Sequence, residues 1–215
     1  DYKVMEFRRV LFRSMDELGS FAIKHNIPVT QTVMGYSTMK RDHSHFLGPI
    51  GGLGGRAANN LAKETDLAIC VGTKLADFTT GSWANFENPE FKLVSINIAR
   101  HDANKHLAEA VIGDAKVCLS ELSNSLGNWK SPDSWHKKSQ DELKSWNEYV
   151  DKESGPTNQE TPNYAHAVGA IYRNSDPTDI AVTAAGGLVG EVVQVWRPKE
   201  LNTHETEWEI GRAHV

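Results

Sequence analysis

Apolar positions in the first half of the chain alternate between the spacing of helices and that of buried strands. The first predicted helix carries an apolar stripe made by Leu18, Phe21, Ala22 and Ile23. Asn26 ends this helix, and the β-branched run at 27–33 predicts a strand. Helical spacing returns at 57–64, and the segment 66–72 (DLAICVG) has apolar residues on both faces. That pattern is typical of a parallel strand covered by helices on each side.

The same alternation continues to residue 126. Strands are predicted at 91–98 and 108–114, and Asp114 is expected to cap the helix that follows. The apolar positions of that helix are Ala115, Cys118, Leu119, Leu122 and Leu126. This β-α-β-α-β order predicts the α/β class, with an open, mainly parallel sheet and right-handed crossovers.

The second half of the chain predicts a different arrangement. Residues 131–154 form a mostly polar helix, expected to lie on the surface, whose thin apolar seam is Leu143, Trp146 and Val150. A linker at 155–162 leads to a second unit. We expect that unit to open on a helix with Thr161 as N-cap and Pro162 at its first position.

On this second-unit helix, one face is predicted to be apolar, formed by Tyr164, Val168 and Ile171. A buried strand at 179–185, a glycine turn and a helix at 188–196 follow. The chain then stops before this unit could close a sheet of its own, so it looks truncated. The two ends, at 1–14 and 209–215, have no partner in these patterns and are predicted to be non-native.

Composition excludes several classes of protein. A net charge of −5 with no arginine-rich segment argues against a nucleic-acid partner. No apolar run approaches the roughly 20 residues that span a bilayer, and no secretory signal is visible. Cys70 and Cys118 each lie in an apolar pattern, and we expect two buried free thiols in the cytoplasm, with a disulfide as the alternative.

Four glycines stand before the helix at 57–64, namely Gly51, Gly52, Gly54 and Gly55. Glycines at this place let the backbone approach an anion at a helix N-terminus. They do not spell the G-x-G-x-x-G dinucleotide motif in register. From spacing alone, a cofactor-binding loop and simple close packing of helix on sheet are equally favoured.

Three further segments carry candidate chemistry. The loop after the strand at 66–72 either lines a ligand crevice or is simply solvated. Its candidate polar lining residues are Lys74, Asp77, Thr79 and Thr80. In TAAGGLVGE, Glu191 lies on the first helical turn, where it complements the helix dipole. His43 and His45 lack the further ligands of a metal site, so a polar loop is favoured.

These segments together resemble the thiamine diphosphate-dependent enzymes of the acetolactate synthase superfamily. The stretch Leu47–Ala58, with Asn59, is similar to that family's glycine-rich loop and helix, and Gly72–Gly81 to its GaRfdDr.tG motif. VSINIARHDANKH and IGDAKVCLSEL are similar to its next two motifs, so the resemblance covers most of 15–128. HNIPVTQTVMGYSTMKRDHSHF and TAAGGLVGEVVQVW point to a ring-opening hydrolase branch of myo-inositol catabolism.

The resemblance implies an organisation of the chain and a chemistry. The implied parts are a Rossmann-like central domain at 15–130, a connector helix and linker at 131–160, and the start of a thiamine diphosphate-binding α/β domain at 161–208. It implies thiamine diphosphate and Mg²⁺ as cofactors, a cyclic polyol-derived diketone as substrate, and a cytoplasmic homo-oligomer. The implied cofactor-binding residues are Ala184, Ala185, Gly186, Gly187, Leu188, Gly51, Gly52, Gly54, Gly72, Lys74, Thr80, Asn97 and Asp114.

Some positions depart from the family pattern. Lys74 stands where the family has arginine, and Asn97 where it has aspartate. FAD is therefore doubtful in the central domain, and an NAD or ADP site, or a vestigial site, is equally favoured. The activating glutamate and the magnesium motif of the family are not found, so we expect a fragment without turnover. The rival functions are an acetolactate synthase-like carboligase and a non-catalytic nucleotide-binding module.

Overall fold

The computed structural model describes residues 14–184 and 186–206, so the predictions for 1–13, for Ala185 and for 207–215 lie outside the described residues. All strand pairs in the described part are parallel. Three small sheets form, one from β1 (Val29–Gln31) and β2 (Phe46–Pro49), and one from β3 (Leu67–Val71), β4 (Lys92–Asn97) and β5 (Glu109–Ile112). The third pairs β6 (Ala181–Thr183) with β7 (His204–Thr206). The predicted parallel α/β class is confirmed.

Helices α2 (Met15–His25) and α6 (Ala115–Leu126) cover one face of β3 and β4. Phe21, Ile96 and Leu119 form the buried centre of this packing. Asp114 caps α6 as predicted, because its carboxylate accepts from the N–H groups of Lys116 and Val117.

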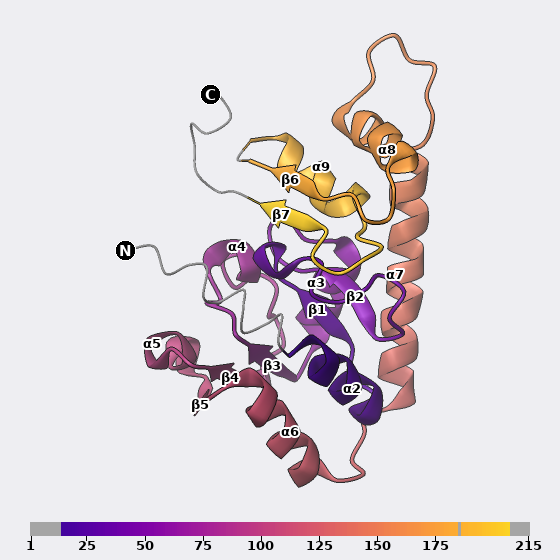
Figure 1. The fold of residues 1–215 in the computed structure, drawn as a ribbon. Helices are drawn as coiled ribbons and strands as arrows, with labels where there is room; N and C mark the ends of the chain where they lie inside the picture. The colour runs from indigo at the N-terminus through magenta and orange to yellow at the C-terminus, as the bar shows by residue number, and fades with distance from the viewer. Residues whose placement is uncertain (1–13, 185, 207–215) are drawn as a thin grey trace.

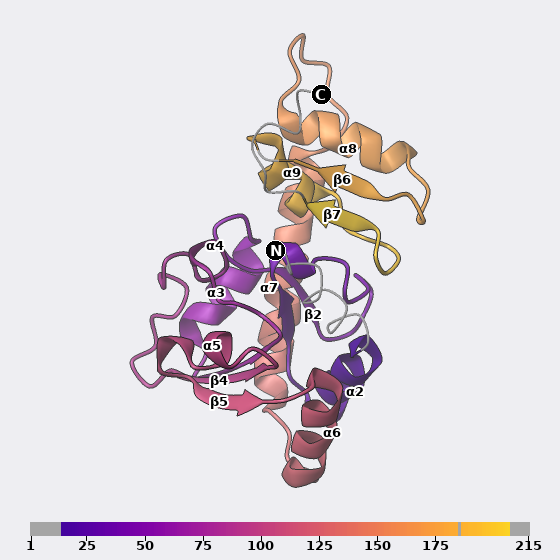
Figure 2. The same cartoon turned by 60° about the vertical axis from the view of Figure 1, so that its left-hand side comes forward.

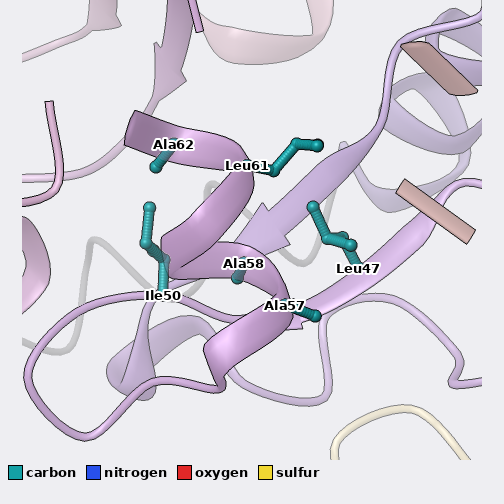
Figure 3. Packing of buried hydrophobic residues seen from close by; sticks show 6 residues of the cluster. All are labelled: Leu47, Ile50, Ala57, Ala58, Leu61 and Ala62. Atoms are coloured by element: carbon teal, nitrogen blue, oxygen red, sulfur yellow. The ribbon is translucent and has the colours of Figure 1, made fainter. Parts of the chain in front are cut away.

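The second layer of the core lies between β2, α3 (Arg56–Glu64) and α7 (Asp133–Glu153). Figure 3 shows its six buried apolar side chains, which come from β2, the residue that follows it, and α3. Trp135, Leu143 and Trp146 of α7 pack against them. The short helices α4 (Asp77–Thr80) and α5 (Arg100–Ala103) and the 3₁₀ turns Val33–Gly35 and Lys105–Leu107 complete this unit.

The second unit consists of α8 (Tyr164–Asn174), β6, α9 (Leu188–Val195) and β7. Figures 1 and 2 show it at one end of α7, while α6 lies near the other end of that helix. Val150 of α7 is buried with Val168, Val192 and Trp196. The predicted connector helix therefore belongs to the cores of both units. In the described part of the chain, no helix is long and apolar enough to cross a membrane.

The apolar stripe predicted for α2 is partly wrong. Ile23 is 55% exposed, whereas His25 is completely buried. The buried face follows the spacing i, i+3, i+4, i+7 from Leu18, which reaches position 25. Position 23 lies about 100° around the helix from Ala22 and so falls off this face. His25 is tolerated there because Trp129 O and Ser123 Oγ lie 2.7 and 3.0 Å from its ring nitrogens.

The prediction that Thr161 caps the second-unit helix is wrong. Asn163 is the N-cap, and its side-chain oxygen accepts from His166 N at 2.9 Å. The His166 ring in turn accepts from Asn163 N, which completes a capping box. Pro162 thus precedes the helix instead of opening it.

The apolar faces predicted for the second unit are also wrong in part. Tyr164 and Ile171 are about 60% exposed, and the buried face of α8 is rotated by one residue onto Val168 and Gly169. The strand β6 is not buried throughout either. Val182 is 68% exposed because its outer face is uncovered in the described part of the chain. Likewise, β3 is only partly buried, with Leu67 47% exposed.

Candidate functional site

The glycine loop, residues 50–55, joins β2 to α3 and is held by an asparagine clamp. Asn59, in the second turn of α3, accepts from Gly51 N through Oδ1 and donates from Nδ2 to Gly51 O, both at 3.0 Å. Asn85 donates to the same Oδ1 at 3.2 Å. The clamp therefore fixes the loop to α3 and to the turn after α4.

The backbone N–H groups of the glycine loop are used within the protein. Gly51 N donates to Asn59, Gly52 N to Phe78 O, Gly54 N to Gly51 O and Gly55 N to Pro49 O. An anion cradle needs such donors to point at the ligand. The N–H groups of all four glycines are therefore already engaged, which favours the alternative of close packing.

The space around the glycines supports the same conclusion. Gly51 has φ +108°, and a Cβ there would stand 2.0 Å from Phe78 O. At Gly54 it would stand 2.4 Å from the carbonyl carbon of Ile50. At Gly52 the nearest atom is 3.8 Å away, so this residue alone of the three has room for a side chain.

The carboxyl ends of β3 and β4 form the edge where a crevice was predicted. Gly72, with φ +63°, extends the ladder by donating to Ile96 O, and Lys74 is exposed two residues later. Thr80 is completely buried and accepts from Trp83 N, so it shapes the turn after α4. Of the predicted lining residues, Lys74 and Asp77 are therefore open to solvent and Thr80 is not.

Asn97 is buried at the end of β4, and both ends of its amide are engaged. Nδ2 donates to Thr73 O at 3.2 Å, and Oδ1 accepts from Ala99 N at 2.9 Å. The amide thus ties the loops after β3 and β4 together. Asp114, across the same edge, is committed to capping α6.

The segment Ala184–Leu188 leads into α9. Gly187 is the N-cap of this helix, and among the described residues no side chain caps the first N–H groups of α9. Gly186 has φ +137° and nothing within 4 Å of a Cβ built there, and Leu188 is 44% exposed. Within the described residues, this helix start is therefore uncovered on the side of Gly186.

The structure brings the glycine loop next to the turn at 77–85 and also to α9. The contact with α9 includes a hydrogen bond from Gln194 Nε2 to Leu53 O. Neither the clamp role of Asn59 nor the contact of Gln194 is predicted from the sequence. Asn59 stands in the glycine-rich motif that resembles the family, whereas nothing local marks Gln194, which is 141 residues from its partner.

Three histidines meet where the loop before β2 contacts α7. The rings of His45 and His136 stack with centroids 4.2 Å apart, and His43 lies 6.0 Å from His45. Burial, with His136 and His43 nearby, lowers the pKa of His45 to about 4. Stacked rings cannot direct nitrogens at one ion, and the described residues hold no group of three or more side chains suited to a metal.

Cys70 and Cys118 are both free thiols, as predicted. Both are partly buried, and burial raises the pKa of Cys70 to about 12. A thiol with so high a pKa is protonated at neutral pH and is a poor nucleophile. Burial raises the pKa of Cys118 as well, so neither cysteine is a candidate catalytic group.

The parallel fold and the segments at its strand ends define the class of protein. Residues 9–122, more than half of the chain, match the family model described as thiamine pyrophosphate enzyme, central domain. The chain therefore belongs to the thiamine pyrophosphate enzyme family. The match begins within the segment predicted to be a non-native flank.

Curated relatives narrow the comparison. The chain is 32% identical over 216 residues to the 3D-(3,5/4)-trihydroxycyclohexane-1,2-dione hydrolase of Clostridium perfringens strain 13 and 32% over 217 residues to that of Bacillus anthracis. It is 33% identical over 222 residues to hydrolase 1 of this name from Bacillus cereus. In each case 90% of this chain aligns with 34% of the relative. The chain spans about a third of the length of the curated relatives that it matches.

Proposed function

We propose that this chain is part of a thiamine diphosphate-dependent hydrolase that breaks a C–C bond. Its substrate would be trihydroxycyclohexane-1,2-dione, opened to 5-deoxy-glucuronate in myo-inositol catabolism by a cytoplasmic homo-oligomer. The observation that carries this proposal is the similarity to relatives named for that activity along 90% of the chain, which includes both units. The chain alone is expected to have no turnover.

The open start of α9 suits the cofactor. The first N–H groups of a helix have no intrahelical partner and carry partial positive charge, which favours a phosphate oxygen. In the part of the chain that the structure describes, no side chain caps these N–H groups, and no atom lies within 4 Å of a Cβ built on Gly186. In our proposal the backbone of Gly186, Gly187 and Leu188 would hold the diphosphate.

The chemistry would divide between the cofactor and the chain. When bound, thiamine diphosphate supplies a nucleophilic carbon and takes up the electron pair as the C–C bond breaks. The chain would orient the cofactor by α9 and Gly186. The described residues contain no cluster of acidic side chains for Mg²⁺, so we propose that other parts of the whole protein provide its ligands.

Calorimetric titration of the chain tests the proposal. Thiamine diphosphate with Mg²⁺ is expected to bind, whereas thiamine without the diphosphate is not. Gly186→Val is expected to weaken binding at least tenfold, since a β-branched residue is strained at φ +137° and would block the helix start. The matched control is Gly127→Val, another positive-φ glycine with open space around it, which follows α6.

Titrations with ADP, NAD and FAD decide between the proposal and the nucleotide-binding rival. Binding of a nucleotide by the folded chain, with no response to thiamine diphosphate, would favour that rival. A second experiment gives the dione to a polypeptide of the relatives' full length. Formation of the ring-opened acid would support the hydrolase. A carboligation product there would favour the acetolactate synthase-like alternative.

A further inference from the structure

Helix α9 of the second unit is docked on the glycine loop by an apolar contact. Leu53, at the tip of the loop, packs against the buried side chains of Val189 and Val193. Gly190 lies beside Leu53 as well, since a Cβ built there would stand 3.7 Å from the Leu53 side chain, an ordinary van der Waals distance. The loop side chain thus lies along one face of α9.

A polar contact fixes the register of that packing. Gln194, one turn beyond Gly190 on α9, donates from Nε2 to the Leu53 carbonyl. Its Oε1 accepts from the indole Nε1 of Trp146 at 3.1 Å. One amide therefore joins the glycine loop, α7 and α9, and both of its hydrogen-bonding ends are engaged.

Gly55 makes this junction possible. A Cβ at that position would stand 2.8 Å from Trp146 Nε1 and 3.1 Å from Gln194 Oε1. The guanidinium of Arg56 lies over the Trp146 ring, 5.4 Å from its centroid, and helps to hold the indole in place. The last glycine of the loop is thus explained by the meeting of the two units.

We infer that Gln194 is a positioning residue, which holds α9 against the glycine loop and so sets the orientation of Gly186, Gly187 and Leu188 relative to the central unit. An eight-residue helix is about 12 Å long and moves as one body. Fixing its last turn at Leu53 therefore restricts its first turn. The importance of that first turn rests on the proposed function, because the same segment is proposed to bind the diphosphate.

Hydrogen exchange of the whole 215-residue chain tests whether Gln194 holds α9 on the glycine loop. Gln194→Met keeps the length of the side chain and removes both hydrogen bonds. We expect exchange of the amides in 188–195 and 50–55 to become about tenfold faster, as for the loss of one or two partly buried hydrogen bonds. Amides of α6 serve as the internal reference. Gln159→Met, in the exposed linker, is the matched control and is expected to change nothing.

A conservative variant separates positioning from simple packing. The tryptophan fluorescence of the chain minus that of its Trp146→Phe variant gives a difference spectrum, which reports on the indole at the junction. Gln194→Met is expected to change that difference spectrum, and Gln194→Glu to restore it, because a carboxylate still accepts from the indole. Gln194→Glu should not restore protection of α9, since it has no N–H for the Leu53 carbonyl.

The affinity for thiamine diphosphate with Mg²⁺ completes the test. Gln194→Met is expected to weaken it at least fivefold. If amides of α9 in Gln194→Met exchange within twofold of the unmodified chain, Gln194 does not hold α9 on the glycine loop. Faster exchange with unchanged affinity would overturn the positioning role of Gln194. No binding by the unmodified chain would count against the proposed function. The exchange and emission data would then still decide whether Gln194 orients α9.

Discussion

Gly51 illustrates how a single residue couples the glycine loop to α4. Its positive φ and the contact with Phe78 O are two separate reasons for glycine. Gly48, in β2 just before this loop, has only the first reason, a positive φ. Its φ is +97°, but nothing lies within 4 Å of a Cβ built there. The pair therefore separates backbone strain from steric overlap.

We predict that Gly48→Ala costs about 1–2 kcal/mol of unfolding free energy, the usual cost of an L residue in the left-handed region. Gly51→Ala should cost at least about 2 kcal/mol more, because a Cβ 2.0 Å from Phe78 O forces the loop to move. Urea denaturation of both variants measures the difference. Equal midpoints would contradict the close-packing explanation of Gly51.

His45 makes the stability of the chain depend on pH. Its folded pKa of about 4 lies below the ordinary value of 6.5, so the unfolded state binds the proton more readily. The contribution of neutral His45 is therefore complete above pH 6.5 and falls as the pH drops toward 4. Two neighbours disfavour a positive charge on His45. These are His136 on α7, which stacks on its ring, and His43 in the same loop.

We expect the chain to lose about 2 kcal/mol between pH 7 and pH 5 through His45. Denaturant midpoints of the chain and of His45→Gln should therefore converge as the pH falls over this range. His101→Gln, at an exposed position of α5, is the control, and its midpoints should run parallel to those of the unmodified chain. Midpoints of His45→Gln that also run parallel would refute the assignment.

At the scale of elements, the helix starts show how local signals compete. Asp114 was identified because a single N-cap candidate precedes α6. Before α8, the chain offers both Thr161 and Asn163, with Pro162 between them. Asn163 prevails because His166 stands three residues later and completes the capping box.

We predict that Asn163→Ala lowers the unfolding free energy by about 1 kcal/mol, the usual loss for an N-cap. Thr161→Ala should leave it within about 0.5 kcal/mol, because this residue lies outside the helix in an exposed segment. Guanidinium titrations followed by circular dichroism measure both variants. A larger effect at Thr161 would mean that the helix begins earlier.

At the scale of the whole molecule, α7 is the element that unites the two cores. Trp146 packs against the cluster of β2 and α3 and also against the cluster of α8 and α9. Among the described contacts, Trp135, eleven residues earlier, packs against the first cluster and not against the second. The two tryptophans therefore offer a comparison within one helix, which Figure 1 shows along the side of the molecule.

We expect Trp146→Ala to cost about 3 kcal/mol and to raise hydrogen exchange in both units, because loss of a packed aromatic leaves a cavity in each core. Trp135→Ala should raise exchange at β2 and α3 but not at α8 and α9. The experiment compares amide exchange of the two variants element by element. Exchange confined to one unit in Trp146→Ala would show that the cores unfold independently.

The sequence by itself determined the class of fold, the order of most elements, the cap of α6 and the family. These follow from signals carried by residues close together in the chain, such as apolar period and cap residues. The family model and the relatives bear out the resemblance. The cofactor-binding residues remain predictions, which the titrations above address.

Only the tertiary structure decided which faces are buried and what the glycines contact. The choice of His25 over Ile23 depends on the elements that pack against α2, and the engaged N–H groups of the glycine loop depend on Asn59 and Phe78. The meeting of Leu53, Trp146 and Gln194 joins segments up to 141 residues apart. Such contacts leave no periodic trace in the sequence, because each is formed by a residue pair that only the packed chain brings together.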